Sequence, residues 1–114
     1  MRVFPSKAHF VESDGEPVRS VITSTQEATL VAWFLKPGQT IAPHIHPHGQ
    51  DTWTILSGSG SYITDRSGSA VAISAGDVVV AKVREVHGVT NNGNVPLVFI
   101  SVVSPGEAEF ELIG

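Results

Sequence analysis

Short apolar stretches separated by turn residues recur along the whole chain. The stretches are rich in Val, Ile, Thr and aromatic residues, and most are followed by Gly, Pro, Asn or Asp. Such runs favour β-strands, and turn signals every ~8–12 residues are typical of an all-β sandwich or barrel. The predicted strands cover residues 18–23, 28–35, 40–46, 51–56, 61–64, 70–73, 78–83, 87–90 and 97–103.

The two ends of the chain are less regular. Residues 3–11 are mixed in character, with Pro5 early, and predict an edge strand or an arm. Residues 106–112 form an acidic tail, the part with the least clear assignment, and no segment of adequate length has the periodicity of a helix. Because the sequence shows no linker, low-complexity segment or tandem repeat, its 114 residues predict a single domain.

The composition limits the classes of protein to which the chain can belong. The chain is 41% hydrophobic and 16% charged, as expected of a globular protein with one core. The net charge of −4 and the lack of a Lys/Arg run argue against a nucleic-acid partner. No apolar run reaches about 18 residues and no basic leader is visible, so we expect no membrane span and a cytoplasmic location. Without cysteine, any bound metal must have nitrogen and oxygen ligands.

The candidate chemistry is concentrated in residues 38–58, where three histidines follow one another closely. His44 and His46 are two residues apart, so both point to one face of an extended strand. By the same alternation Asp51 shares a face with Trp53 in the next predicted strand. Far along the chain His87 begins another strand. Imidazole and carboxylate together form a ligand set suited to Fe, Mn, Ni, Zn or Cu.

At these residues the chain resembles the cupin family. The first cupin motif is Gly, five residues, His-x-His, three or four residues, Glu, six residues, Gly. Gly38, His44, His46 and Gly58 stand in those places, and Asp51 occupies the Glu position with the four-residue spacer. The paired spacings are much more specific than His-x-His alone.

The second cupin motif is Gly, five residues, Pro-x-Gly, two residues, His, three residues, Asn. Gly76, His87 and Asn91 match it, whereas Lys82 and Arg84 replace the Pro and the Gly. The resemblance implies that Asn91 either contacts the metal ligands without binding the metal itself, or forms a turn. It covers most of the chain, with the motif-bearing barrel over about residues 30–103 and strand-forming pieces in residues 1–29.

The resemblance implies a double-stranded β-helix, or jelly-roll barrel, that binds a divalent transition metal. The implied ligands are His44, His46, Asp51 and His87. Asp is one methylene shorter than Glu, so Asp51 can instead orient a water or a ligating histidine. Gln50 fits the alternative three-residue spacer and is the other candidate for the fourth ligand.

Several further residues are candidates for a pocket beside the metal, although each has a simpler interpretation. Aromatic residues at strand positions most often belong to the core, and Trp53 is the one best placed by alternation to shape a pocket. His48 is interpreted as a loop residue at the barrel mouth that can contact a substrate, and His9 matches no motif. The pocket candidates are Trp53, Tyr62, Asn91, Phe34, Phe99 and His48.

Three classes of function are compatible with these features. A metalloenzyme acting on a small organic substrate, of the dioxygenase, isomerase or lyase/decarboxylase type, is the one we favour. A non-catalytic module that binds a sugar or another small molecule is the alternative, and a structural or storage role is the third. Strand-forming pieces outside the barrel, together with the tendency of small cupins to pair through such strands, predict a homodimer.

Overall fold

Ten β-strands and one short 3-10 helix account for the regular structure of the computed structural model, which describes residues 2–113. The strands are β1 (Ser20–Ser24), β2 (Thr29–Leu35), β3 (Thr40–Ile45), β4 (Gln50–Ser57), β5 (Ser59–Ile63), β6 (Ala70–Ser74), β7 (Val78–Ala81), β8 (His87–Thr90), β9 (Leu97–Ser104) and β10 (Glu111–Leu112). The described residues contain no helix long and apolar enough to cross a membrane.

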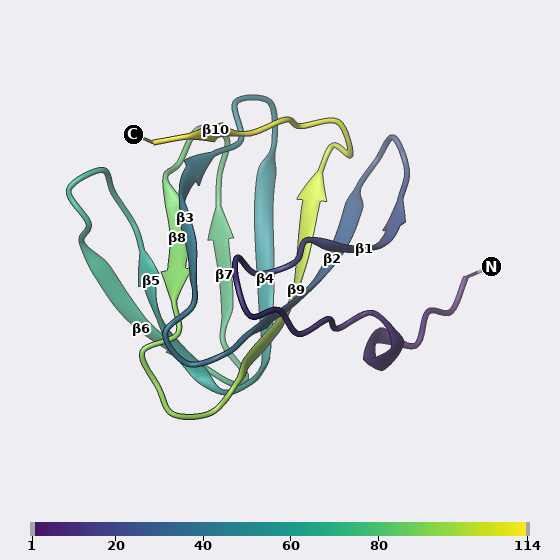
Figure 1. Ribbon diagram of the computed structural model, residues 1–114. Helices are drawn as coiled ribbons and strands as arrows, with labels where there is room; N and C mark the ends of the chain where they lie inside the picture. Colours follow the sequence, from purple (N-terminus) through teal and green to yellow (C-terminus); the bar gives the residue numbers. More distant parts are fainter. Residues whose placement is uncertain (1, 114) are drawn as a thin grey trace.

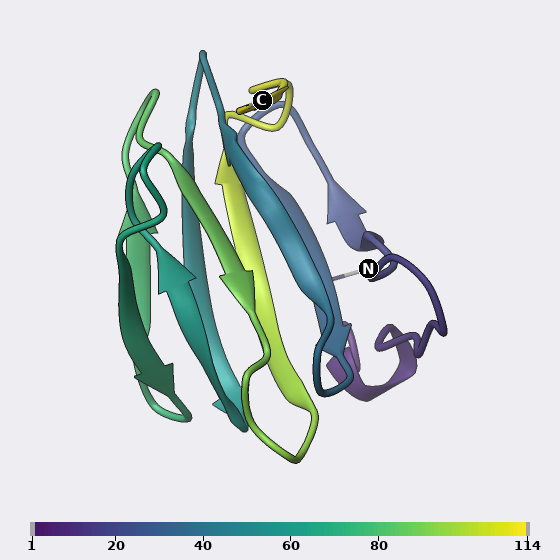
Figure 2. The same cartoon turned by 60° about the vertical axis from the view of Figure 1, so that its left-hand side comes forward.

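The strands form two five-stranded antiparallel sheets, with the orders β1-β2-β9-β4-β7 and β10-β3-β8-β5-β6. Strands distant in sequence are neighbours: β9 lies between β2 and β4, and β8 lies between β3 and β5. Figures 1 and 2 show the two sheets enclosing a common interior. This is the jelly-roll barrel, or double-stranded β-helix, predicted from the sequence, and that prediction is confirmed.

Each of the nine predicted strands corresponds to an observed one, with ends that differ by at most two residues. One of the largest differences, at the end of β7, has a local cause. Residues 78–83 were expected to form a strand, but β7 ends at Ala81 because a turn begins there. The main-chain N–H of Lys82 donates to the Glu85 carboxylate at 2.8 Å. Arg84 adopts a φ of 66°, a conformation that cannot continue a strand.

The hydrophobic core occupies the half of the barrel interior in which β9 begins. In β9 every second residue from Leu97 to Val103 is buried, the alternation expected of a strand with one inward face. Trp53 stacks on Phe99 with ring centroids 4.3 Å apart and meets Tyr62 edge-on at 5.2 Å. Burial of side chains of this size stabilises the fold by about 1.5–3 kcal/mol each. The other half of the barrel interior remains available for a site.

An irregular arm, residues 2–19, precedes β1. It contains a 3-10 helix at Ser6–Ala8, and the expectation of an edge strand or an arm over residues 3–11 resolves to the arm. The arm is attached to the turn after β2. The Gln39 side-chain amide donates to the carbonyl oxygens of Ser13 and Gly15, at 2.6 and 2.8 Å. These bonds bring the arm across the barrel (Figure 1).

The C-terminal segment, residues 105–113, folds back over the barrel after β9. It ends in β10, a two-residue strand that the sequence did not predict and that pairs with β3. Ala108 is buried at 1% exposure. Gly49 explains the close approach, because a Cβ atom there would lie 2.4 Å from the Ala108 Cβ. The segment therefore packs on the turn between β3 and β4.

Candidate metal centre

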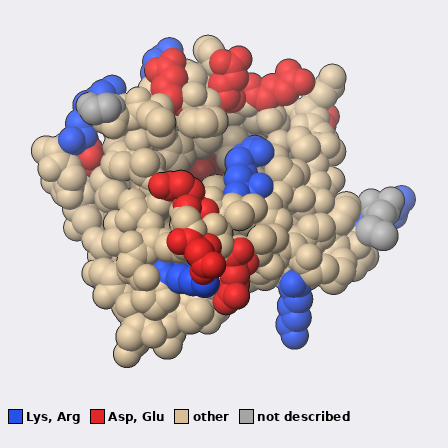
Figure 3. All heavy atoms as spheres, viewed as in Figure 1, with Lys and Arg blue, Asp and Glu red and all other residues tan. Residues whose placement is uncertain are grey.

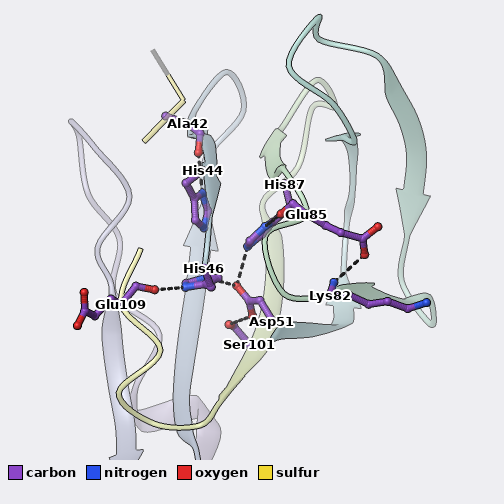
Figure 4. A network of polar contacts seen from close by, with 9 residues as sticks. All are labelled: Ala42, His44, His46, Asp51, Lys82, Glu85, His87, Ser101 and Glu109. Carbon is purple, nitrogen blue, oxygen red and sulfur yellow. Dashed lines mark hydrogen bonds and ion pairs between the residues drawn. The ribbon is translucent and has the colours of Figure 1, made fainter. Parts of the chain in front are cut away.

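Four side chains, from three strands and from the connection after β3, converge inside the barrel. His44 lies in β3, His46 directly after it, Asp51 in β4 and His87 at the start of β8. One nitrogen or oxygen atom from each lies within 4.8 Å of those from the other three, so the four can hold a metal ion. Figure 4 shows them pointing toward one another. The structure thus brings together the four ligands that the cupin resemblance implied.

Strand pairing explains how distant residues meet. The antiparallel pairing of β3 with β8 sets His44 directly opposite His87, and their ring centroids are 4.1 Å apart. Residues 46–49 connect β3 to β4, which delivers Asp51 from the facing sheet. His44 and His87 therefore come from paired strands of one sheet, and the Asp51 carboxylate comes from the opposite sheet.

The Nδ1 atom of each histidine lies beside a main-chain carbonyl oxygen. His44 Nδ1 is 2.8 Å from the Ala42 oxygen, His46 Nδ1 is 2.6 Å from the Glu109 oxygen, and His87 Nδ1 is 3.1 Å from the Glu85 oxygen. A carbonyl oxygen only accepts hydrogen bonds, so each Nδ1 must carry the proton and donate.

These three contacts determine the tautomer of each ring. In a neutral imidazole the other nitrogen, Nε2, then carries an unprotonated lone pair. In His46 and His87 that Nε2 atom faces Asp51 (Figure 4). Metal-binding histidines typically donate their second nitrogen to a carbonyl or carboxylate in this way. The three imidazoles are thus arranged for metal binding.

Asp51 is the buried carboxylate of the group, at 4% exposure. Its Oδ2 lies 3.3 Å from His46 Nε2 and 3.1 Å from His87 Nε2, and its Oδ1 accepts from the Ser101 hydroxyl. Burial raises the pKa of Asp51, but its contacts with His46 and His87 and the hydrogen bond from Ser101 outweigh burial and hold that pKa well below its ordinary value. The group is therefore an anion at neutral pH.

In this environment the pKa values of His44 and His46 shift in opposite directions. Burial, followed by the nearby His87, lowers the pKa of His44 to about 4. Burial also acts to lower the pKa of His46, yet hydrogen bonds to Asp51 and to the Glu109 carbonyl raise it overall. Because Nδ1 of His46 already donates, its contact with Asp51 requires either a second proton on Nε2 or a cation between the two groups. An ion ligated by three imidazoles and one carboxylate fits this donor set.

Gln50 and Asp51, the two candidates for the fourth ligand, lie on opposite faces of β4. Asp51 is buried in the cluster, whereas Gln50 is exposed. Successive residues of a strand point to opposite sides, so both side chains cannot reach the same centre.

Ser101 is a site residue that sequence reasoning missed. Its hydroxyl donates to Asp51 Oδ1 at 2.5 Å, and it is 1% exposed. Ser101 occupies an inward position of β9 between Phe99 and Val103. The signal was a lone hydroxyl residue at an apolar-facing strand position, which needs a buried hydrogen-bond partner.

A cavity of about 520 Å³ opens beside His44, His46 and Asp51. It lies between β3 and the facing strands β2, β4 and β9, and both the arm and the C-terminal segment contribute to its wall. Figure 3 shows a hollow on this face of the molecule with acidic and basic side chains beside it. Its lining includes His44, His46, Asp51, Trp53, Ser101, Val31, Trp33, Ile41, Val103, Glu16, Arg19, Glu109 and Phe110.

Of the six pocket candidates from the sequence, Trp53 lines this cavity and the other five do not. Tyr62 and Phe99 pack in the core, against Trp53. Phe34 follows Trp33 in β2 and therefore faces the opposite side of the sheet. His48 is exposed in the turn after β3.

Asn91 forms a turn. Its side-chain amide donates to the carbonyl oxygens of Leu35 and Val95, both at 2.9 Å, and its Oδ1 accepts from the Gly93 N–H at 3.0 Å. These bonds tie the turn between β8 and β9 to the end of β2. Of the two roles implied for Asn91, support of the site and turn formation, its hydrogen bonds match the second.

Trp33 and Arg19 are among the lining residues that were not candidates. Trp33 shares its strand face with the buried Val31, so alternation along β2 could have found it. Arg19 belongs to the arm, and no sequence pattern connected it with the histidines.

A model of the cupin domain family matches residues 31–103. The crystal structure of a conserved protein with a double-stranded β-helix domain from Klebsiella pneumoniae is similar over 100% of this chain and 98% of that one, with 45% identity and a TM-score of 0.96. A predicted oxalate decarboxylase from Thermotoga maritima is 25% identical, with a TM-score of 0.75 over 90% of this chain and 98% of that chain.

A curated relative, the oxalate-binding protein of Thermotoga maritima, is 35% identical over 69 residues. The match covers 60% of this chain and 55% of that protein, so it spans little more than half of the relative.

Proposed function

The chain belongs to the cupin family, and from that premise we propose that it is a metal-dependent enzyme acting on a small organic substrate. The observation that carries the proposal is the convergence of three histidines and Asp51 beside a cavity of about 520 Å³. Cavities of about 300–1,000 Å³ are the usual size for small-molecule sites.

The residues of the chain prepare the site in three ways. Main-chain carbonyls hold each histidine in the tautomer that leaves Nε2 free. Ser101 fixes Asp51 by occupying Oδ1. The buried Val31, Trp53 and Val103 give the cavity beside these residues an apolar wall. Such preorganisation lets binding groups act without rearranging during the reaction.

When bound, a divalent ion of Fe, Mn, Ni, Zn or Cu supplies Lewis-acid polarisation for isomerase, lyase or decarboxylase chemistry, or redox chemistry for a dioxygenase. Glu16 lies in the cavity wall and is exposed, so its carboxylate can exchange protons with solvent. The main-chain carbonyl of Glu109 faces His46, whereas its carboxylate points away from the histidines (Figure 4).

A non-catalytic binding module is the second candidate, favoured by the name of the oxalate-binding relative. The enzyme and the binding module differ in whether the protein converts its ligand into a product. The test begins with protein purified without chelator, in which elemental analysis should find a near-stoichiometric divalent metal. His87→Ala should lose it. If wild type stays metal-free after supplementation with Fe, Mn, Ni, Zn and Cu, the proposal fails.

Turnover is then measured with the metal-loaded protein and oxalate under air. Loss of oxalate that depends on His87 would establish an enzyme, whereas saturable binding without loss would favour the binding module. Because oxalate is only one substrate, the same assay extends to other small organic acids, with the His87→Ala protein as the blank in each case.

The homodimer expected from the sequence remains a prediction. Edge strands with free hydrogen-bonding groups tend to be paired or covered, and β1 and β7 are the edges of one sheet. Sedimentation equilibrium should give twice the chain mass of 12.1 kDa; a monomer mass over the whole concentration range would contradict it.

A further inference from the structure

Arg19 is a cation in the wall of the cavity that the metal site does not use. It lies at the end of the arm, just before β1, and its side chain is exposed. No ion pair involves it within residues 2–113. A guanidinium stays protonated at all ordinary pH values and binds carboxylates through paired N–H donors. An exposed cation at a cavity opening is thus available to an anionic group.

The wall between the opening and the metal ligands is largely apolar. Val31 and Trp33 contribute from β2, Val103 from β9, Ile41 from β3 and Phe110 from the C-terminal segment. Such a surface stabilises an apolar group by about 25 cal/mol per Å² removed from water. A two-carbon dianion such as oxalate has no apolar group to place there.

Trp53 also contributes to the wall of the cavity and is 1% exposed. Its indole Nε1 is buried without a hydrogen-bond partner among the described residues. Because no water-sized group reaches that atom, Trp53 offers the cavity apolar ring surface rather than a hydrogen bond.

We propose that the cavity binds a small organic anion with an apolar body. Its carboxylate pairs with Arg19 at the opening, its body packs against Trp33, Val31 and Phe110, and its other end lies by Trp53. The inference rests on the proposed function, because this other end lies beside the residues proposed to bind the metal. It adds a substrate class: an organic acid with an apolar body, larger than oxalate.

The chain contains its own reporter for this binding. Its two tryptophans, Trp33 and Trp53, both line the cavity. Intrinsic fluorescence can therefore follow titration of the zinc-loaded protein with four probes: 4-hydroxyphenylacetate, its uncharged amide, phenylacetate without the hydroxyl, and oxalate. The same titrations with metal-free protein show which contacts need the metal.

We expect 4-hydroxyphenylacetate to bind about fivefold more tightly than its amide, the effect of one exposed ion pair worth about 1 kcal/mol. Phenylacetate, which has the same charge and nearly the same apolar body, should bind about as tightly. Oxalate should bind at least about tenfold more weakly, since it buries no apolar surface.

Arg19→Gln should remove the preference for the acid over the amide. Arg66→Gln, which removes an equal charge from the exposed turn between β5 and β6, should leave it unchanged. Glu16→Gln should strengthen acid binding, because a like charge leaves the cavity wall. Arg19→Lys should keep part of the preference.

The proposal is overturned if no probe binds, if acid and amide bind equally to wild type, or if oxalate binds most tightly. It is also overturned if Arg19→Gln retains the full preference, since the metal would then bind the carboxylate. Elemental analysis separates this result from failure of the metal site: a protein that takes up no metal contradicts the proposed function, while the acid–amide comparison in metal-free protein still tests Arg19.

Discussion

Ser101 holds one oxygen of the Asp51 carboxylate and leaves the other to the histidines. The hydroxyl donates to Oδ1, while Oδ2 faces His46 and His87. The two residues come from adjacent strands, β9 and β4, and both are buried. The pair fixes the orientation of the only carboxylate in the ligand group.

Ser101→Ala should therefore reduce both stability and metal affinity. The substitution leaves Asp51 Oδ1 buried without its donor, which costs about 1–3 kcal/mol of unfolding free energy. Loss of a residue that orients a ligand typically weakens metal binding by about 10–100-fold. Urea denaturation and a chelator-competition titration measure the two effects. Ser57→Ala, at an exposed position of β4, is the matched control and should change stability by less than about 0.5 kcal/mol.

Asp51→Ala should abolish metal binding, whereas Gln50→Ala should leave the metal content unchanged. The two residues are adjacent, but one faces the cluster and the other faces solvent. Elemental analysis after identical purification compares the variants. Metal retained by Asp51→Ala and lost by Gln50→Ala would assign the fourth ligand to Gln50 and contradict the geometry.

The metal-free protein should lose stability as the pH falls from about 6.5 to about 4. The pKa of His44 is lowered to about 4 in the folded chain, while an unfolded histidine binds its proton near 6.5. The unfolded state thus binds more protons in this window, and His44 contributes a slope of at most about 1.4 kcal/mol per pH unit. The raised pKa of His46 acts in the opposite direction and reduces the net slope.

His44→Phe should flatten this pH dependence, because the group that must remain uncharged is gone. Urea denaturation of chelator-treated protein at pH 7, 6 and 5 gives the slope. His48→Phe removes an exposed imidazole outside the cluster and serves as the control. An unchanged slope in His44→Phe would show that the proton uptake occurs elsewhere.

Gly106→Ala should displace the C-terminal segment. A Cβ atom there would lie 1.8 Å from the main-chain oxygen of Thr25, which cannot move without disrupting the turn before β2. Overpacking of this kind costs about 1–3 kcal/mol. Because the Glu109 carbonyl accepts from His46 Nδ1, metal affinity should fall as well. Thermal unfolding and metal titration test both, and Gly15→Ala, with open space around its Cβ, should behave as wild type.

Much of the fold could be predicted because strand signals are local. Alternation and turn residues located nine strands, and the inward face of β4 followed from the parity of Asp51 and Trp53. The end segments could not be predicted in the same way. β10 is only two residues long and exists through pairing with β3, a tertiary contact that leaves little trace in its own sequence.

The candidate ligands were predictable from spacing, whereas their surroundings were not. His44 and His87 stand at positions that the cupin motifs specify. Ser101 and Arg19 reach the cavity only because β9 and the arm are folded against it. Trp33 lines the cavity, whereas Tyr62 lies in the core. The register of their strands decides this, and register cannot be read from the local sequence pattern.

The three hydrogen bonds that set the histidine tautomers all end on main-chain oxygens, those of Ala42, Glu85 and Glu109. A side-chain acceptor can be lost by a single codon change, but a peptide carbonyl is present whatever residue occupies the position. Substitutions at Ala42 and Glu85 therefore leave the acceptor of the ring proton in place. At Glu109 the backbone φ of 55° restricts which residues fit, so the candidate metal centre constrains this position through its main chain rather than through its side chain.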